Sequence, residues 1–280
     1  MIWKVGRVTI TRIVELETVG GTRFILPQAT AERVRELPWL MPHFAEENGR
    51  LRMSVHSLVV ETPLRRIIVD TGLGNDKRDR QVPAWNGLNT PFLESLTAAG
   101  YAPDSIDTVL CTHLHVDHVG WNTRWRDDRW VPTFPNARYV FGRAEYDYWA
   151  GHRDAPEHRA VFDDSIRPVV EAGLVDLVAS DTQICDEITL IPTPGHSPGH
   201  VSIHIRSDGE AALLSGDTAH HPCQMAHLDW SSTVDSDPAQ STASRRMLFS
   251  RFADTPTLVI GGHFPAGRLK RDGDAFRFEV

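Results

Sequence analysis

Apolar residues recur in short runs along the whole chain, and most of these runs are bounded by Gly, Pro, Asn or Asp. Short runs rich in Val, Ile and Leu are typical of strands, particularly where they alternate with polar residues. The stretches that we expect to form strands are residues 2–5, 8–14, 51–60, 66–69, 106–110, 139–141, 174–178, 188–191, 201–205, 211–214, 257–260 and 275–278.

Capping residues and helical spacing predict helices among these strands. Thr90, Pro91 and Gly100 bracket one of them, as an N-cap, a first helical residue and a residue just past the end. The expected helices cover residues 30–37, 91–99, 145–150, 159–172 and 238–252. No repeat, low-complexity tract or linker interrupts this mixed order, so we expect one α/β (α+β) domain over residues 1–280.

Two connections stand out by length and composition. The connection from Gly72 to Thr90 is too long for an ordinary loop, which makes it a candidate functional loop, and we also expect a loop over residues 121–135. The Arg and Asp residues of the second connection are interleaved, which favours a surface loop whose positive and negative charges balance each other. Tryptophans in or beside these connections either line an apolar pocket or belong to the core; they are Trp85, Trp121, Trp125, Trp130 and Trp149.

Three imidazoles and one carboxylate directly follow the expected strand 106–110, in the run Thr-His-Leu-His-Val-Asp-His. In an extended segment alternate residues face the same side, so His113 and His115 can hold one metal ion, while Asp117 and His118 face another after a turn. Imidazole and carboxylate without thiolate suit zinc. The cluster also lies at the carboxyl end of a strand, where α/β proteins commonly bind ligands.

The same pattern of an apolar strand followed by a polar ligand candidate occurs three more times. His196 follows the strand 188–191, Asp217 follows 211–214, and His263 follows 257–260. Each residue alone could belong to a turn, but the repetition favours a shared metal site.

His-x-His-x-Asp-His followed by a distant His, Asp and His resembles the signature of the metallo-β-lactamase superfamily and covers most of the chain. The resemblance implies a four-layer αβ/βα sandwich and a hydrolase with two Zn²⁺ per chain, or Mn²⁺, Fe²⁺ or Co²⁺ in their place. Two such ions activate a shared water and polarise the bond under attack. The ligand sets that the resemblance implies are His113, His115 and His196 for one ion, Asp117, His118 and His263 for the other, and Asp217 as the bridge.

Two further residues could support these ligands. Asp70 matches the superfamily's buried aspartate, which orients a ligand by a hydrogen bond, and His200 follows closely after His196. A turn aspartate and an ordinary structural histidine are the alternative interpretations.

Within the superfamily, Asp217 stands where the commonest zinc β-lactamases carry Cys, and too few residues follow it for the glutathione-binding region of glyoxalase II. The redox branch replaces the second His of the motif, whereas His115 is intact. Among the hydrolases with this ligand set, the chain resembles the acyl-homoserine lactonases and the methyl-parathion-hydrolase-like esterases. The lactonases typically carry Tyr three residues after the bridging Asp, but this chain has His220, as in the organophosphate and aryl-ester group.

The resemblance implies a metal-dependent hydrolase of the lactonase or esterase type, acting on small, mainly apolar esters or lactones. Asp117, Asp217 and His220 are the candidate catalytic residues, with His220 as a proton donor or a mere loop residue. The alternatives are phosphotriester hydrolysis or hydrolytic dehalogenation of an aromatic on the same metals, and a metal-bound sensor or binding protein with little turnover.

The charge and the hydrophobic pattern of the chain limit the kinds of molecule that it is expected to bind. A net charge of −8 disfavours nucleic-acid binding, and no apolar run is long enough to cross a membrane, so we expect a small-molecule substrate. The start of the chain lacks signal-peptide features, and three widely spaced cysteines argue against a disulfide framework. We therefore expect a cytoplasmic protein, with a homodimer left open.

Overall fold

The computed structural model describes residues 1–20 and 22–280, and the chain divides into two compact units. Unit 1 consists of Met1–Glu15 and Val55–Ala179, and unit 2 consists of Leu16–Ser54 and Ser180–Val280. The boundaries fall inside two long strands, β2 (Val8–Val19) and β3 (Arg52–Glu61), so each of these strands contributes residues to both units. One domain over residues 1–280 stays a prediction.

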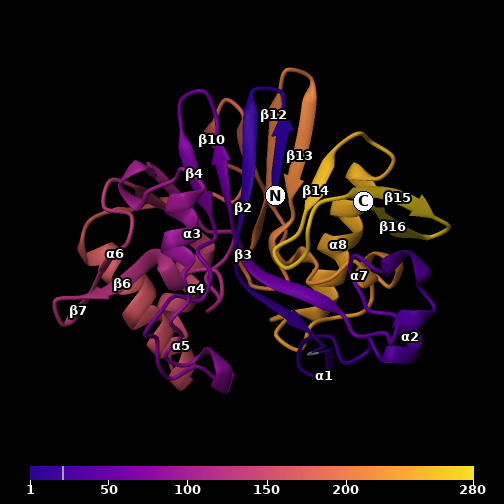
Figure 1. Ribbon diagram of the computed structural model, residues 1–280, viewed down its shortest axis with the longest axis horizontal. Helices are drawn as coiled ribbons and strands as arrows, with labels where there is room; N and C mark the ends of the chain where they lie inside the picture. The colour runs from indigo at the N-terminus through magenta and orange to yellow at the C-terminus, as the bar shows by residue number, and fades with distance from the viewer. Residues whose placement is uncertain (21) are drawn as a thin grey trace. The chain divides into compact units, whose positions relative to one another are not determined.

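Unit 1 is built on a seven-stranded mixed sheet (Figure 1). Its strands, in spatial order, are β1 (Ile2–Val5), β2, β3, β4 (Arg66–Val69), β5 (Thr108–Leu110), β8 (Arg138–Gly142) and β9 (Val175–Val178). The neighbours from β4 to β9 are parallel, whereas β1 pairs with β2 and β3 with β4 in the antiparallel sense. The residues that follow β4, β5 and β8 are therefore brought to one edge of the sheet.

The helices of unit 1 contribute to an apolar core with the strands. They are α3 (Phe92–Ala98), α4 (Arg143–Gly151), α5 (Pro156–Val161), η5 (Phe162–Ile166) and α6 (Arg167–Glu171), with single turns η2 (Pro83–Trp85), η3 (Pro103–Ser105) and η4 (Gly120–Asn122). Fully buried Phe92, Val109 and Tyr139 lie in this core. The predicted helix over residues 159–172 is part of a longer helical stretch whose middle turn is a π-helix.

Unit 2 contains a five-stranded sheet in the order β10 (Gln183–Cys185), β11 (Ile188–Pro192), β12 (Val201–Ser207), β13 (Glu210–Leu214) and β14 (Leu258–Ile260). β12 is antiparallel to both β11 and β13, and β14 is parallel to β13. It follows that β11, β13 and β14 run in the same direction and end at the same edge.

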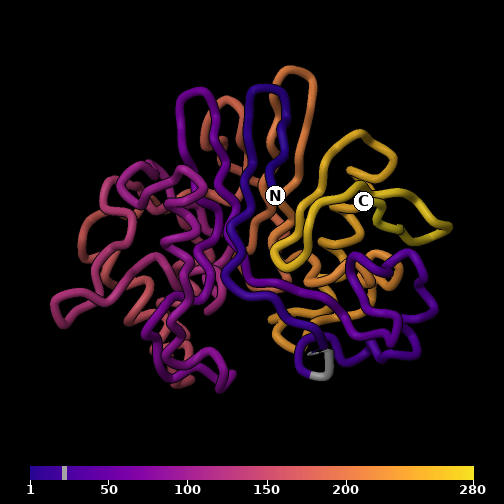
Figure 2. The backbone as a smooth tube through the Cα atoms, in the orientation of Figure 1, coloured from indigo at the N-terminus to yellow at the C-terminus, as the bar shows by residue number. Residues whose placement is uncertain are grey.

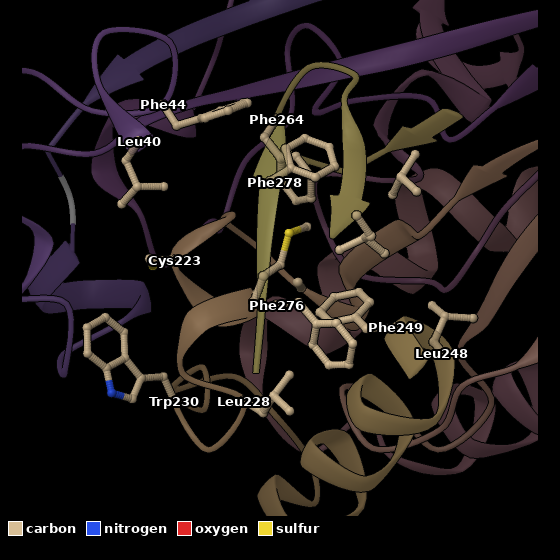
Figure 3. Packing of buried hydrophobic residues seen from close by; sticks show 14 of the residues in the cluster. Leu40, Phe44, Cys223, Leu228, Trp230, Leu248, Phe249, Phe264, Phe276 and Phe278 are labelled. Carbon is tan, nitrogen blue, oxygen red and sulfur yellow. The ribbon is translucent and has the colours of Figure 1, made fainter. Parts of the chain in front are cut away.

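The predicted helix over residues 238–252 is confirmed as α8 (Pro238–Phe252), where the Asp237 side chain accepts a hydrogen bond from the backbone N–H of Gln240 at 3.0 Å. The shorter helices of unit 2 are α1 (Thr22–Ile25), α2 (Ala31–Arg35), η1 (Pro38–Leu40), η6 (Gly216–Thr218) and α7 (Cys223–Ala226). Its core is rich in aromatic rings, with Phe249 beside Phe276 and Trp230 nearby (Figure 3).

Two distant parts of the sequence meet in this core. The segment that carries η1 lies beside the C-terminal strand β16 (Ala275–Glu279), as the purple and yellow parts of the tube show (Figure 2). The ring centroids of Phe44 and Phe278 are 5.5 Å apart, so the early segment of unit 2 closes over the last strand of the chain.

Residues 121–135, predicted as a loop, contain a hairpin of β6 (Thr123–Arg126) and β7 (Arg129–Pro132). Asp127 and Asp128 have φ values of 51° and 56°, which suit the two-residue turns that match the twist of hairpin strands. These strands were not predicted because their many charged residues interrupt the apolar alternation that is typical of a strand. The same reason explains β15 (Arg268–Asp272), an unpredicted strand in which only Leu269 is buried.

Among the residues that the structure describes, no helix combines the length and the apolar character that crossing a membrane requires.

Candidate metal centre

In unit 1 the histidine motif begins just past the carboxyl end of β5, as predicted. The ring centroid of His113 lies 4.6 Å from that of His115 and 4.1 Å from that of His118. A turn closed by the backbone N–H of His118 donating to the carbonyl of His115 at 3.1 Å brings the third imidazole back to the first. The motif therefore gathers its imidazoles at one point.

Asp70, at the carboxyl end of the neighbouring strand β4, fixes this motif. Its carboxylate accepts hydrogen bonds from the backbone N–H of Thr112 at 2.7 Å and from the Thr112 hydroxyl at 2.8 Å. Nδ1 of His118 donates to the same carboxylate at 2.9 Å, which turns Nε2 of that ring toward the other motif residues. Asp70 thus orients a candidate ligand, and its φ of 52° lies in the left-handed region that Asp tolerates better than most residues.

Cys111, next to the motif, does not add a thiolate to this donor set. Burial raises the pKa of its thiol well above the usual range, and the negative charge of Asp70 raises it further. A protonated thiol is a poor metal ligand, so the candidate donors of unit 1 are imidazole and carboxylate groups. Zinc binds both of these groups in proteins.

In unit 2, three strand ends deliver His196, Asp217 and His263 to the same edge of the sheet. Oδ2 of Asp217 lies 3.4 Å from Nε2 of His196 and 3.1 Å from Nε2 of His263. Close approach of the loop after β14 is possible because residue 262 is glycine: a Cβ there would stand 2.4 Å from Oδ1 of Asp217.

Both imidazoles are held through their outer nitrogens. Nδ1 of His196 donates to Asp235 at 2.9 Å, and Nδ1 of His263 donates to the carbonyl of Ser54 at 3.0 Å. A neutral imidazole that donates through Nδ1 presents a lone pair at Nε2. Two lone pairs directed toward one carboxylate oxygen repel each other unless a cation or a proton lies among them, so this donor set fits a metal ion.

Asp235 was not found by sequence reasoning. It lies just before the run Ser236-Asp237-Pro238, which indicates the start of a helix. This signal identifies Asp237 as a capping residue and gives no role to Asp235. Asp235 also lies 3.9 Å from the fully buried guanidinium of Arg245, whose Nε donates to the carbonyl of Thr218 at 2.8 Å. A buried carboxylate without an adjacent apolar run has no sequence signal that would have identified it.

His200 supports Asp217 through the backbone. Its Nε2 accepts a hydrogen bond from the N–H of Asp217 at 2.9 Å, and its Nδ1 donates to the Thr193 hydroxyl at 2.9 Å. These two bonds fix a neutral ring with the proton on Nδ1. The sequence left open whether His200 supports the site, and in the structure it contacts the candidate bridging residue directly.

His220 is buried, with 1% of its surface exposed, so the surface-loop interpretation is wrong. Its Nε2 lies 3.3 Å from Oδ2 of Asp217, and its ring centroid lies 4.7 Å from that of His196. Within the described part of the chain, neither ring nitrogen of His220 has a hydrogen-bond partner. A buried imidazole beside a candidate ligand, with both nitrogens available, can donate a proton or bind a ligand.

The tryptophans divide between core and cavity. Trp121 is a core residue. Its ring stacks on that of Phe92 with centroids 5.5 Å apart, and its Nε1 donates a hydrogen bond to the Glu15 carboxylate at 2.7 Å. Trp125 and Trp130 line a cavity of about 770 Å³ in unit 1. Trp149 is buried against His115, with ring centroids 5.2 Å apart.

The chain matches the profile of the metallo-β-lactamase superfamily over residues 50–263, well over half of its length. The chain belongs to this superfamily. All the candidate metal ligands lie within or at the edge of the matched range. The predicted metallo-β-lactamase fold is confirmed by this match and by similar solved structures.

Curated relatives include superfamily members named as lactonases. N-acyl homoserine lactonase AiiA of Bacillus thuringiensis subsp. kurstaki is 27% identical over 181 residues, which cover 59% of this chain and 63% of the relative. The probable metallo-hydrolase YybB of Bacillus subtilis (strain 168) is 25% identical over 191 residues, which cover 66% and 74%. The chain thus spans less than two thirds of the length of the lactonases that it matches.

Solved structures share the fold along nearly the whole chain. The dizinc quorum-quenching lactonase AidC has a TM-score of 0.80 at 21% sequence identity, with 99% of this chain and 96% of that chain covered. The hydrolase AbOPH has a TM-score of 0.81 at 23% identity over the same shares. Identities this low establish the metallo-β-lactamase fold and leave the reaction to the residues of the site.

Proposed function

We propose that the protein is a dinuclear zinc-dependent hydrolase that cleaves small, mainly apolar esters or lactones. The observation that carries the proposal is the orientation of the candidate ligands: outer nitrogens of His118, His196 and His263 donate to Asp70, Asp235 and a backbone carbonyl. Metal-ligating histidines are held in this way in characterised metalloenzymes. Superfamily membership supports the same proposal.

The proposed ligands follow the family pattern. One ion would be held by His113, His115 and His196, and the other by Asp117, His118 and His263, with Asp217 bound to both. When bound, two zinc ions lower the pKa of a water molecule toward neutrality and polarise the bond under attack. The donor chemistry fits zinc, because imidazole and carboxylate are present and the neighbouring Cys111 thiol stays protonated.

The other residues of the site orient these ligands and move protons. Asp70 and Asp235 hold imidazoles in one tautomer, and His200 holds the backbone of Asp217. Nε2 of His220 lies 3.3 Å from Oδ2 of Asp217, which supports a role for His220 in protonating the leaving oxygen or in donating a hydrogen bond to developing negative charge. Asp117 and Asp217 would each supply a carboxylate oxygen to the proposed metal site.

The substrate class rests on two observations. The relatives named N-acyl homoserine lactonases act on an ester bond in a ring, and they match this chain at 27% identity. The chain carries a net charge of −8, which favours an uncharged substrate over a polyanion such as nucleic acid. Three free cysteines fit a reducing compartment, and we propose the cytoplasm as the place of action.

A substrate screen tests the proposal. Zinc-loaded protein is assayed against alkyl lactones, aryl esters and phosphotriesters, and Asp217→Ala serves as the inactive control. We expect turnover of lactones or esters that the control lacks. Turnover of phosphotriesters alone would indicate an organophosphate hydrolase instead. The presence of His220 in place of Tyr also favours that alternative. Tight zinc binding without turnover of any class would indicate a sensor or binding protein.

A further inference from the structure

Helix α4 carries a buried carboxylate that is hydrogen-bonded to the backbone of the histidine motif. Oε1 of Glu145 accepts a hydrogen bond from the backbone N–H of Leu114 at 3.0 Å. Leu114 is the residue between His113 and His115, so the bonded peptide joins two proposed ligands of the same ion. Only 1% of the Glu145 surface is exposed.

Trp149 completes this arrangement one helical turn later. Its indole Nε1 donates to the same Oε1 of Glu145 at 2.7 Å, and its ring packs edge-on against His115 with centroids 5.2 Å apart. Residues four apart lie on one face of a helix, which explains why α4 presents both side chains to the motif. One face of α4 therefore contacts the motif through a carboxylate and an indole.

We propose that Glu145 is a positioning residue that sets the orientation of His113 and His115 for metal binding. The inference rests on the proposed metal site and adds a residue to it that the family signature does not contain. The hydrogen bonds of Glu145 to the Leu114 peptide and to the Trp149 indole link it to the two imidazoles.

The geometry explains why this position requires an acceptor. A buried N–H left without an acceptor costs free energy, and the Glu145 side chain supplies that acceptor. Leu114 is buried, so water is not a ready substitute acceptor for its backbone N–H. Without the Glu145 acceptor the 113–115 backbone would rotate to find another partner, and the two imidazoles would diverge.

The test measures metal binding instead of turnover. Zinc affinity is measured by competition with a chromogenic chelator, and the visible absorption spectrum of the Co²⁺-loaded protein reports the ligand geometry. For Glu145→Ala we expect a loss of zinc affinity of about 10- to 100-fold, as for other residues that orient metal ligands, and an altered Co²⁺ spectrum. Glu145→Gln should recover most of the affinity, because its amide oxygen can accept the same bonds.

Asp147→Asn is the matched control, since Asp147 is an exposed carboxylate on the same helix and should leave both readouts unchanged. If Glu145→Ala does not fold, Glu145→Leu fills the space without an acceptor and takes its place. A folded Ala or Leu variant with wild-type zinc affinity and Co²⁺ spectrum would overturn the inference. Failure of the proposed metal site, on which the inference rests, is distinguishable, because the wild-type protein itself would then bind no zinc; the substrate screen tests hydrolysis separately.

Discussion

His220 is the residue that most directly links the site to the reaction. Its Nε2 lies 3.3 Å from Oδ2 of Asp217, and neither ring nitrogen has a hydrogen-bond partner in the described part of the chain, so the imidazole is available to donate a proton. We expect His220→Ala to lower kcat by about 10²- to 10⁴-fold on alkyl lactones, the usual contribution of a positioned general acid, with zinc content unchanged. Steady-state kinetics and elemental analysis measure the two quantities.

The leaving group distinguishes proton donation from other roles of His220. Nitrophenyl esters need little proton assistance, so the alanine variant should lose much less activity on them than on lactones. His220→Tyr restores a donor at the position where lactonases of the superfamily carry Tyr, and it should exceed His220→Ala on lactones. Equal losses on all substrates would instead assign His220 a metal-binding role.

His221, the next residue, predicts a pH dependence of stability. Burial lowers the pKa of His221 from 6.5 to about 4, although its Nε2 donates to the Phe44 carbonyl at 2.8 Å. Between pH 4 and pH 6.5 the His221 imidazole is therefore protonated in the unfolded chain but neutral in the folded chain. Stability from this group is complete above pH 6.5 and is lost as the pH falls through 4, by about 3 kcal/mol for a shift of this size.

His221→Gln keeps a hydrogen-bond donor but does not titrate. Chemical denaturation of both proteins from pH 4 to pH 8 gives the difference between their free energies of unfolding at each pH. We expect the advantage of the wild-type protein to shrink as the pH falls. A difference that is constant over this range would show that His221 titrates normally in the folded protein.

At the scale of elements, the loop after β14 and the turn η6 approach each other only because residue 262 lacks a side chain. The Cβ of Gly262→Ala would stand 2.4 Å from Oδ1 of Asp217, so the carboxylate must move away. Displacing a catalytic group by about 1 Å can cost about 10²-fold in rate, and we expect a loss of this order in kcat. Gly151→Ala is the control, since an added Cβ there meets no atom within 4 Å.

Circular dichroism should show that both glycine variants keep the wild-type fold, because the clash at Gly262 falls mainly on the end of a side chain. Wild-type activity in Gly262→Ala would mean that Asp217 has no required position, and its proposed bridging role would be wrong.

Elements with strong apolar runs were predicted from the sequence, and those with charged runs were not. Strand β5 and helix α8 were found because burial of Val109 and capping by Asp237 leave direct signals. The hairpin β6–β7 and strand β15 were missed because partly exposed strands tolerate Arg and Asp at most positions.

The ligand candidates were predicted because each follows a strand, whereas the residues that orient them were found only partly. Asp70 and His200 lie near recognisable motifs. Asp235 and Glu145 act through tertiary contacts with residues 39 and 31 positions away, and periodicity carries no information on such contacts.

At the scale of the whole molecule, the proposed ligands come from stretches that lie far apart in the sequence, from His113 to His263. Such a ligand set is complete only in the folded chain, so zinc binding should favour folding. A ligand at 100 times its dissociation constant stabilises the folded state by about 2.7 kcal/mol per site. For a protein of this size, each kcal/mol raises the Tm by about 2–4 °C, so zinc should raise it by about 5–10 °C per site.

Differential scanning calorimetry of metal-free and zinc-loaded protein measures this shift, and elemental analysis should give close to two zinc ions per chain. Asp217→Ala is the informative variant, because loss of the proposed bridge should reduce both the shift and the metal content. Magnesium at the same concentration should have little effect, since imidazole ligands do not suit it. A Tm that does not respond to zinc, or responds equally in Asp217→Ala, would contradict the proposed ligand set, because a bound metal that prefers the folded chain must stabilise it.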